Sequence, residues 1–102
     1  MTPEHVPADF ERTMGCTSAD LLRCLPLALQ GCRLEVNEAE GWAHAAFSDG
    51  TLRLHWRSQP DRHIALLAIP RLQVRFGYRG LTAERRHEVQ RRFDLATQRG
   101  GG

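Results

Sequence analysis

The sequence predicts an α+β fold in which helices cover one face of an antiparallel β-meander of four to five strands. Apolar and polar residues alternate along most of the segment from Cys32 to Arg79, which is typical of strands with one buried face. Within it, Asp49-Gly50 is typical of a two-residue hairpin turn. Apolar residues at helical spacing flank this segment, so we expect N-terminal helices and one C-terminal helix, all packed on the apolar face.

The N-terminal region predicts two helices. Residues 7–14 are expected to form a short one. Thr17, followed three residues later by Asp20, has the pattern of a capping box. The apolar run 21–29 then predicts a buried helix, and Pro26 is expected to kink or split it.

The strands of the meander are expected at residues 32–36, at residues 41–48, after the hairpin turn, and at residues 63–79 as one bent strand or two. Residues 58–61 predict a second turn, because Ser, Pro and Asp favour turns. Pro70 is expected to interrupt the ladder or to begin a new edge strand.

The Asp49-Gly50 turn also predicts a register for its two strands. With these residues as the loop, Phe47 pairs with Leu52 and His44 pairs with His55. Bulky apolar residues then share one face, so the register agrees with the hydrophobic pattern.

The C-terminal helix is expected to begin after a Thr82 cap and to run to about Gln98. Its narrow apolar stripe consists of Val89, Phe93 and Ala96. Residues 1–98 therefore form one expected α+β domain, and residues 99–102 form a flexible Gly-rich tail. That tail resembles the exposed diglycine end of ubiquitin-like proteins and sulfur carriers, but in those families it follows a strand of a β-grasp fold.

Composition limits the classes of protein to which the chain can belong. It has 102 residues, 41% of them hydrophobic, which suits one globular domain. No apolar run is long enough to cross a bilayer, and the start of the chain does not resemble a secretory signal. We therefore expect a cytoplasmic protein with no membrane partner.

Charge is divided unevenly between the two halves. All 14 cationic side chains are arginines, and the net charge is +2. Residues 1–50 contain three arginines and eight acids, and residues 51–102 contain eleven arginines and four acids. This division predicts either pairing within the chain or a basic surface for an anionic partner.

The polar face of the predicted sheet is the candidate binding site. It is expected to carry Arg33, Trp42, His44, Arg53, His55, Arg57, Arg71, Arg75 and Arg79. We interpret the protein as a non-catalytic binding or adaptor module that uses this face for a protein partner or for self-association, for example as a homodimer. Single-stranded nucleic acid is the alternative partner, because such ligands use basic faces that carry aromatic rings. The alternative without a ligand is a solvated face on which Glu35 pairs with arginines.

The sequence predicts no catalytic residue, metal site or cofactor. Paired His44 and His55 lack enough acid or sulfur ligands beside them for a metal ion. Cys16 precedes a predicted helix, where a thiolate would be stabilised. A thiol enzyme or carrier that uses Cys16 or the C-terminal glycines is therefore an alternative, although no histidine is tied to Cys16 by spacing.

Overall fold

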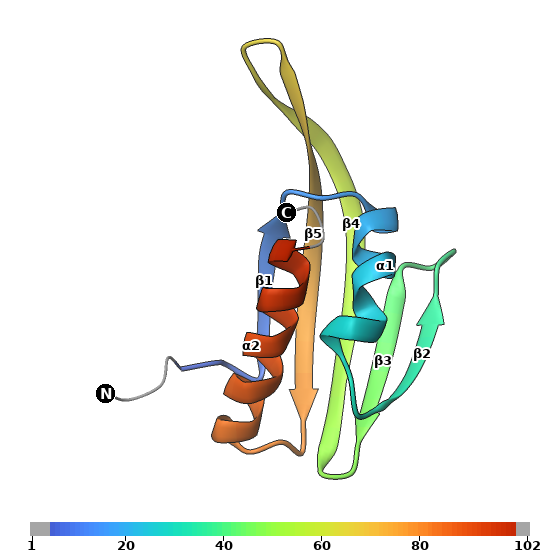
Figure 1. The fold of residues 1–102 in the computed structure, drawn as a ribbon, viewed down its shortest axis with the longest axis vertical. Helices are drawn as coiled ribbons and strands as arrows, with labels where there is room; N and C mark the ends of the chain where they lie inside the picture. Colours follow the sequence, from blue (N-terminus) through green and yellow to red (C-terminus); the bar gives the residue numbers. More distant parts are fainter. Residues whose placement is uncertain (1–4, 100–102) are drawn as a thin grey trace.

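Five antiparallel strands form one sheet, and two helices lie side by side on one of its faces (Figure 1). This computed structural model describes residues 5–99. The elements are β1 (Asp9–Met14), α1 (Ser18–Ala28), β2 (Arg33–Asn37), β3 (Trp42–Phe47), β4 (Gly50–Ile64), β5 (Leu67–Arg79) and α2 (Ala83–Arg99). The strand order β1-β5-β4-β3-β2 makes β2 to β5 a meander and places β1 at the edge beside β5. The predicted α+β class and the helices on one face are confirmed.

The helix expected over residues 7–14 is wrong, because this segment forms strand β1. Phe10 and Met14 are four residues apart, a spacing that suits a helix face and also one face of a strand. In the structure Phe10 pairs with Phe76 of β5, and the two rings stack with centroids 4.6 Å apart. Burial of Phe10 against the sheet decides the outcome, and α1 is left as the one helix that precedes β2.

Helix α1 begins as predicted and ends at Ala28, one residue before the end of the predicted apolar run. The Thr17 side chain accepts from the Asp20 backbone, and the Asp20 carboxylate accepts from the Thr17 backbone N–H. Pro26 does not split the helix, which continues to Ala28. A proline this close to the C-terminal end removes only one of the last backbone hydrogen bonds.

The hairpin between β3 and β4 has a different register from the one predicted. Phe47 pairs with Gly50, so the loop is Ser48-Asp49, and His44 lies opposite Arg53 instead of His55. Gly50 belongs to the strand because it allows a close approach: an added Cβ would lie 2.8 Å from the Leu81 backbone nitrogen. The shift is two residues, so every side chain keeps its predicted face.

The turn expected at residues 58–61 is also wrong. Strand β4 continues to Ile64, and the turn is Ala65-Leu66. Pro60 lies within an irregular stretch of register, and Pro70 lies opposite that stretch, so neither proline removes a ladder hydrogen bond. Residues 63–79 therefore contain the end of β4, a turn and the whole of β5, instead of one bent strand or two strands divided at Pro70.

Beyond Ser58 and Leu72 the two long strands have no third strand beside them, since β3 pairs with β4 only to His55 and β1 ends opposite Leu72. We call residues Gln59–Arg71 the arm. Figure 1 shows the arm projecting past the helices and the other strands.

The core lies between the sheet and the two helices. Phe76 of β5 is fully buried and meets Phe93 of α2 edge to face, with ring centroids 5.2 Å apart. Val89 and Ala96 are buried beside Phe93, which confirms the predicted stripe of the last helix. Gly100–Gly102 of the predicted tail lie outside the described residues, and α2 extends to Arg99.

Candidate functional site

The sheet has an open face, on the side away from α1 and α2. Because residues paired across strands share a face, the registers place all nine predicted site residues on the strands of this side. We call this side of the sheet the open face. It consists of these nine residues and their neighbours on strand β1. The nine residues are Arg33, Trp42, His44, Arg53, His55, Arg57, Arg71, Arg75 and Arg79. The structure thus brings the predicted set onto one surface, with pairings that differ from those predicted.

Strand β1 adds two acids to the open face that the sequence interpretation missed. Glu11 accepts from the Arg75 Nε and NH2 groups at 2.9 and 2.7 Å, and it also accepts from Gln73. Asp9 forms an ion pair with Arg79 at 3.0 Å. The hydrogen bond from Arg75 is the main cause that lowers the pKa of Glu11. The alternation of Asp9 and Glu11 with Phe10 was the signal that could have revealed them.

The other arginines of the open face have different environments. Arg71 donates to the Pro60 carbonyl oxygen at 2.8 Å, at the start of the arm. Arg33, Arg53 and Arg57 form no ion pair with any residue in the range 5–99. These three arginines lie on β2 and β4, and the charge of Arg57 is close enough to Glu11 to help lower the pKa of that carboxyl.

Aromatic side chains lie among these arginines. The rings of Trp42 and His44 stack with centroids 4.4 Å apart, and His44 is 6.4 Å from His55 across the strand pair. Trp42 is half-buried, and one side of its ring is already occupied by His44. In the described part of the chain no group of three metal-ligating side chains comes together.

A hollow of about 260 Å³ opens on the same face, over β1, β5 and β4. Its lining consists of Glu11, His55, Trp56, Arg57, Gln73 and Arg75. Arg57 is the cation of this lining that has no carboxylate bound to it, whereas Arg75 holds Glu11. The hollow is therefore suited to an acidic side chain that approaches Arg57.

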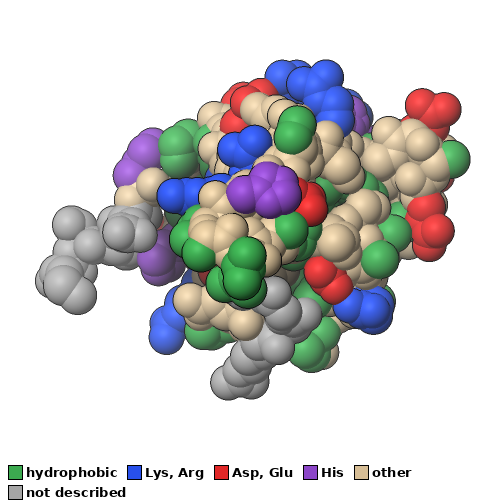
Figure 2. Space-filling model, turned by 90° about the horizontal axis from the view of Figure 1, so that it is seen from above, with side chains coloured by type: hydrophobic (Ala, Val, Ile, Leu, Met, Phe, Trp, Pro, Cys, Tyr) green, Lys and Arg blue, Asp and Glu red, His purple; other side chains and the backbone are tan. Residues whose placement is uncertain are grey.

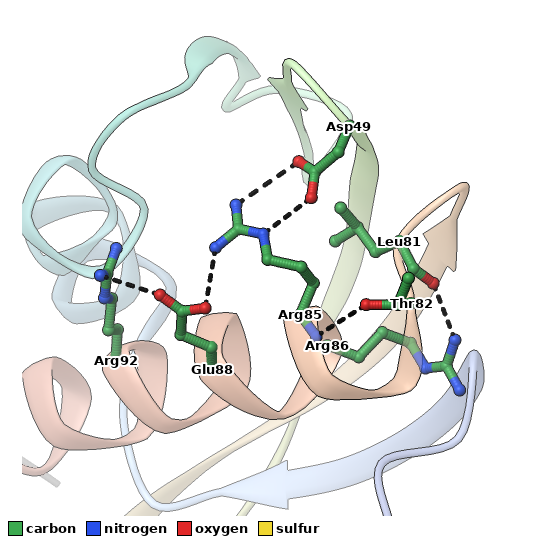
Figure 3. A network of polar contacts seen from close by, with 7 residues as sticks. All are labelled: Asp49, Leu81, Thr82, Arg85, Arg86, Glu88 and Arg92. Carbon is green, nitrogen blue, oxygen red and sulfur yellow. Dashed lines mark hydrogen bonds and ion pairs between the residues drawn. The ribbon is translucent and has the colours of Figure 1, made fainter.

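Two arginines of α2, Arg85 and Arg86, bind groups of other elements of the molecule. Arg85 donates to Asp49 at 2.8 Å and lies 3.2 Å from Glu88, which in turn pairs with Arg92 (Figure 3). Arg86 donates to the backbone oxygens of Leu81 and Val6. The hydrogen bond from Arg85 lowers the pKa of Asp49. Three arginines of the basic half, Arg75, Arg79 and Arg85, are thus paired with acids of the acidic half.

The cysteine environments give no support to a reactive thiol. Cys16 is buried, and burial is the main cause that raises the pKa of its thiol, with the Asp20 charge adding to the effect. An activated thiolate requires a shift in the opposite direction. Cys24 and Cys32 are half-buried, and all three cysteines are free thiols.

Among residues 5–99, neither helix combines the length and the apolar character that a membrane span requires. Comparison of the chain with models of known protein families gives no match, and a search among curated proteins gives no significant match.

Proposed function

We propose that the protein is a non-catalytic binding module of the cytoplasm, and that an acidic protein segment binds on its open face. The observation that carries the proposal is the position of Arg33, Arg53 and Arg57, which share a face that no helix covers and which have no ion-pair partner among the described residues. Complementary charge favours the docking of carboxylates on such a surface. The three free cysteines support a reducing compartment.

The open face favours an acidic protein segment over single-stranded nucleic acid. Nucleic acid strands bind through several aromatic rings on which successive bases stack. Here one tryptophan, Trp42, already stacks on His44. Glu11 and Asp9 neutralise Arg75 and Arg79 on this face, so a long phosphate chain meets few free cations there, whereas a short acidic segment can bind beside Arg53 and Arg57 alone.

The test measures binding of an acidic peptide and of a single-stranded oligonucleotide by fluorescence anisotropy at about 50 mM salt, where charge-driven binding is strong. The first variant, Arg53→Ala with Arg57→Ala, removes two unpaired arginines of the open face. The matched control, Arg23→Ala with Arg92→Ala, removes two exposed arginines from the helices and leaves the same net charge.

We expect the peptide to bind, the first variant to weaken binding at least tenfold, and the control to change it little. Binding of the oligonucleotide but not of the peptide would overturn the acidic-protein proposal in favour of nucleic acid. Equal losses in the two variants, or no binding of either probe, would show that the open face is not the binding surface.

A further inference from the structure

We propose that two copies of this chain pair through strand β2, antiparallel and about a two-fold axis, so that two five-stranded sheets join into one. Strand β2 is an edge of the sheet, with β3 on one side and no strand of this chain on the other. The proposal goes beyond the proposed function, whose test removes Arg53 and Arg57 of β4 and leaves β2 unchanged.

The first observation is that the main chain of β2 is open to another strand. At a sheet edge, alternate residues point N–H and C=O groups outward, where no strand pairs with them. Natural edges are often blunted by prolines, bulges or charges, lysine above all. Strand β2 contains no proline, and its register with β3 runs without a shift from Arg33 to Asn37. Its main chain is therefore regular enough to pair with a further strand.

The second observation is the pair of charges on β2. Glu35 lies on the open face together with Arg33, because Glu35 pairs with His44 of β3. Neither Arg33 nor Glu35 forms an ion pair with a residue in the range 5–99. The two charges are of opposite sign and two residues apart, so the strand can offer each charge of a second copy its opposite.

These charges select one register. When Leu34 lies on the two-fold axis, opposite its own copy, Arg33 of each chain lies opposite Glu35 of the other. A register centred on Arg33 would place the two arginines opposite each other, and one centred on Glu35 would do the same for the glutamates. Opposite charges directly across two strands stabilise the pair, and like charges destabilise it. The register centred on Leu34 is therefore the favoured one.

The same register matches the apolar side chains on the helix side of the sheet. Leu34 and Val36 face that side, because their partners on β3 are buried alanines. Val36 is 39% exposed, so the helices leave part of this edge uncovered. About the axis, Leu34 meets its own copy, and Val36 meets the half-buried Cys32 of the other chain. The contact thus joins apolar with apolar side chains and each charge with its opposite.

Two further acids, Glu38 and Glu40, lie in the turn that follows β2. Figure 2 shows acidic side chains at the side of the molecule on which β2 lies, to the right as in Figure 1. In the antiparallel contact the two turns lie at opposite ends, so the Glu38 residues of the two copies are about eight residues of strand apart, roughly 26 Å. That separation exceeds the Debye length of about 8 Å at physiological salt, so these acids oppose the contact little.

The opposite edge, β1, does not offer the same contact. Its charged side chains all form ion pairs within the molecule: Asp9 with Arg79, Glu11 with Arg75 and Arg12 with Asp94. A self-pairing of β1 centred on Phe10 would also place Asp9 opposite Glu11, which are both acids. The assembly therefore closes at two copies, because each copy has one edge suited to self-pairing.

The test is sedimentation equilibrium of the full chain, for which we expect a dimer. The paired edge is short, so its dissociation constant should lie in the micromolar range. Arg33→Glu places acids opposite acids, Glu35→Arg places arginines opposite arginines, and each should raise that constant at least about tenfold. Arg91→Glu and Glu84→Arg make the same changes of charge at exposed positions of α2, away from β2, and should leave the dimer unchanged.

A mixture of the two β2 variants tests the register. Arg33→Glu has two acids on β2 and Glu35→Arg has two arginines, so a heterodimer places opposite charges at both positions. We expect the mixture to associate about as tightly as the wild type, although each variant alone is largely monomeric. Both positions are exposed, so both variants should fold, which circular dichroism checks.

The outcomes separate this proposal from the proposed function. Arg53→Ala with Arg57→Ala should leave the dimer intact, so loss of peptide binding does not bear on the pairing of β2. A wild-type chain that stays monomeric at about 100 μM, assemblies larger than a dimer, or equal losses in the α2 controls would overturn the pairing through β2. Failure of the mixed variants to associate would overturn the register centred on Leu34.

Discussion

The inner and outer halves of the β4–β5 hairpin belong to the same two strands but differ in what surrounds them. In the inner half Leu52, Leu54 and Phe76 are fully buried under the helices, and β3 and β1 pair on either side. In the outer half, the arm, Leu66 is fully exposed and no third strand pairs. An apolar residue in a strand therefore indicates a core only where another layer covers that part of the strand.

The largest expected effect on stability lies in the inner half. Phe76→Ala removes a side chain that stacks on Phe10 and meets Phe93 edge to face. We expect the free energy of unfolding to fall by about 3–5 kcal/mol, from lost burial and the cavity that remains. Urea unfolding of the two proteins in one buffer measures the difference.

Leu66→Ala is the matched change in the arm, and we expect it to alter the unfolding free energy by less than about 0.5 kcal/mol. A loss for Leu66→Ala that equals the loss for Phe76→Ala would mean that the arm and the body are one cooperative unit. The comparison of the two halves would then fail.

The start of β4 is the next place at which the inner half is sensitive. In Gly50→Ala the new Cβ meets the backbone of Arg79 and Leu81, and backbone atoms cannot move aside as a flexible side chain can. We expect a loss of about 1–3 kcal/mol in unfolding free energy, as for other overpacked sites.

Gly15→Ala is the control, because the nearest atom to its added Cβ is Ile69 Cγ2 at 4.0 Å. This substitution should leave stability unchanged or raise it by about 0.4–1 kcal/mol through the unfolded state. Equal losses in the two variants would contradict the close approach at Gly50. Thermal unfolding of both variants in one buffer decides the matter.

The amino-acid pattern predicts which side chains share a face better than which ones pair. Alternation placed all nine site residues on one side, and a register error of two residues left that result unchanged. The neutralisation of Arg75 and Arg79 could not be predicted, because it depends on β1 joining β5 more than 60 residues away in the chain. The sequence did not predict the arm, because a proline such as Pro60 is as typical of a turn as of an irregular stretch of strand.

Acidic pH should lower the stability of the inner half of the hairpin, because ion pairs between β1 and β5 stabilise its edge. The folded-state pKa of Glu11 lies below its ordinary value of 4.5, so the ionised carboxylate favours the folded state. This contribution is complete above about pH 5 and is lost as the pH falls through the lowered pKa. The hydrogen bond from Arg85 also lowers the pKa of Asp49, so the contribution of Asp49 to stability changes with pH in the same direction.

Urea unfolding between pH 7 and pH 3 measures this dependence. Glu11→Gln should flatten the profile, and Arg75→Gln should remove the same part of it, because the two residues form one pair. The double variant should then resemble either single variant. Additive effects of the two substitutions would show that Arg75 is not the group that stabilises the Glu11 carboxylate.

The smallest expected effect is at the tip of the arm, in Ala65→Gly. Ala65 has a left-handed backbone conformation, which costs an L-residue about 1–2 kcal/mol, and glycine would remove this cost. Glycine is also more flexible in the unfolded state, which offsets about 0.5–1 kcal/mol of the stabilisation. The arm should therefore become more stable by up to about 1 kcal/mol. Because the arm has no neighbouring strand, the gain should be local: amide hydrogen exchange in the arm should slow up to about fivefold, with global unfolding unchanged. An equal rise in global stability would mean that the arm unfolds only with the body, and unchanged exchange would mean that Ala65 carries no strain.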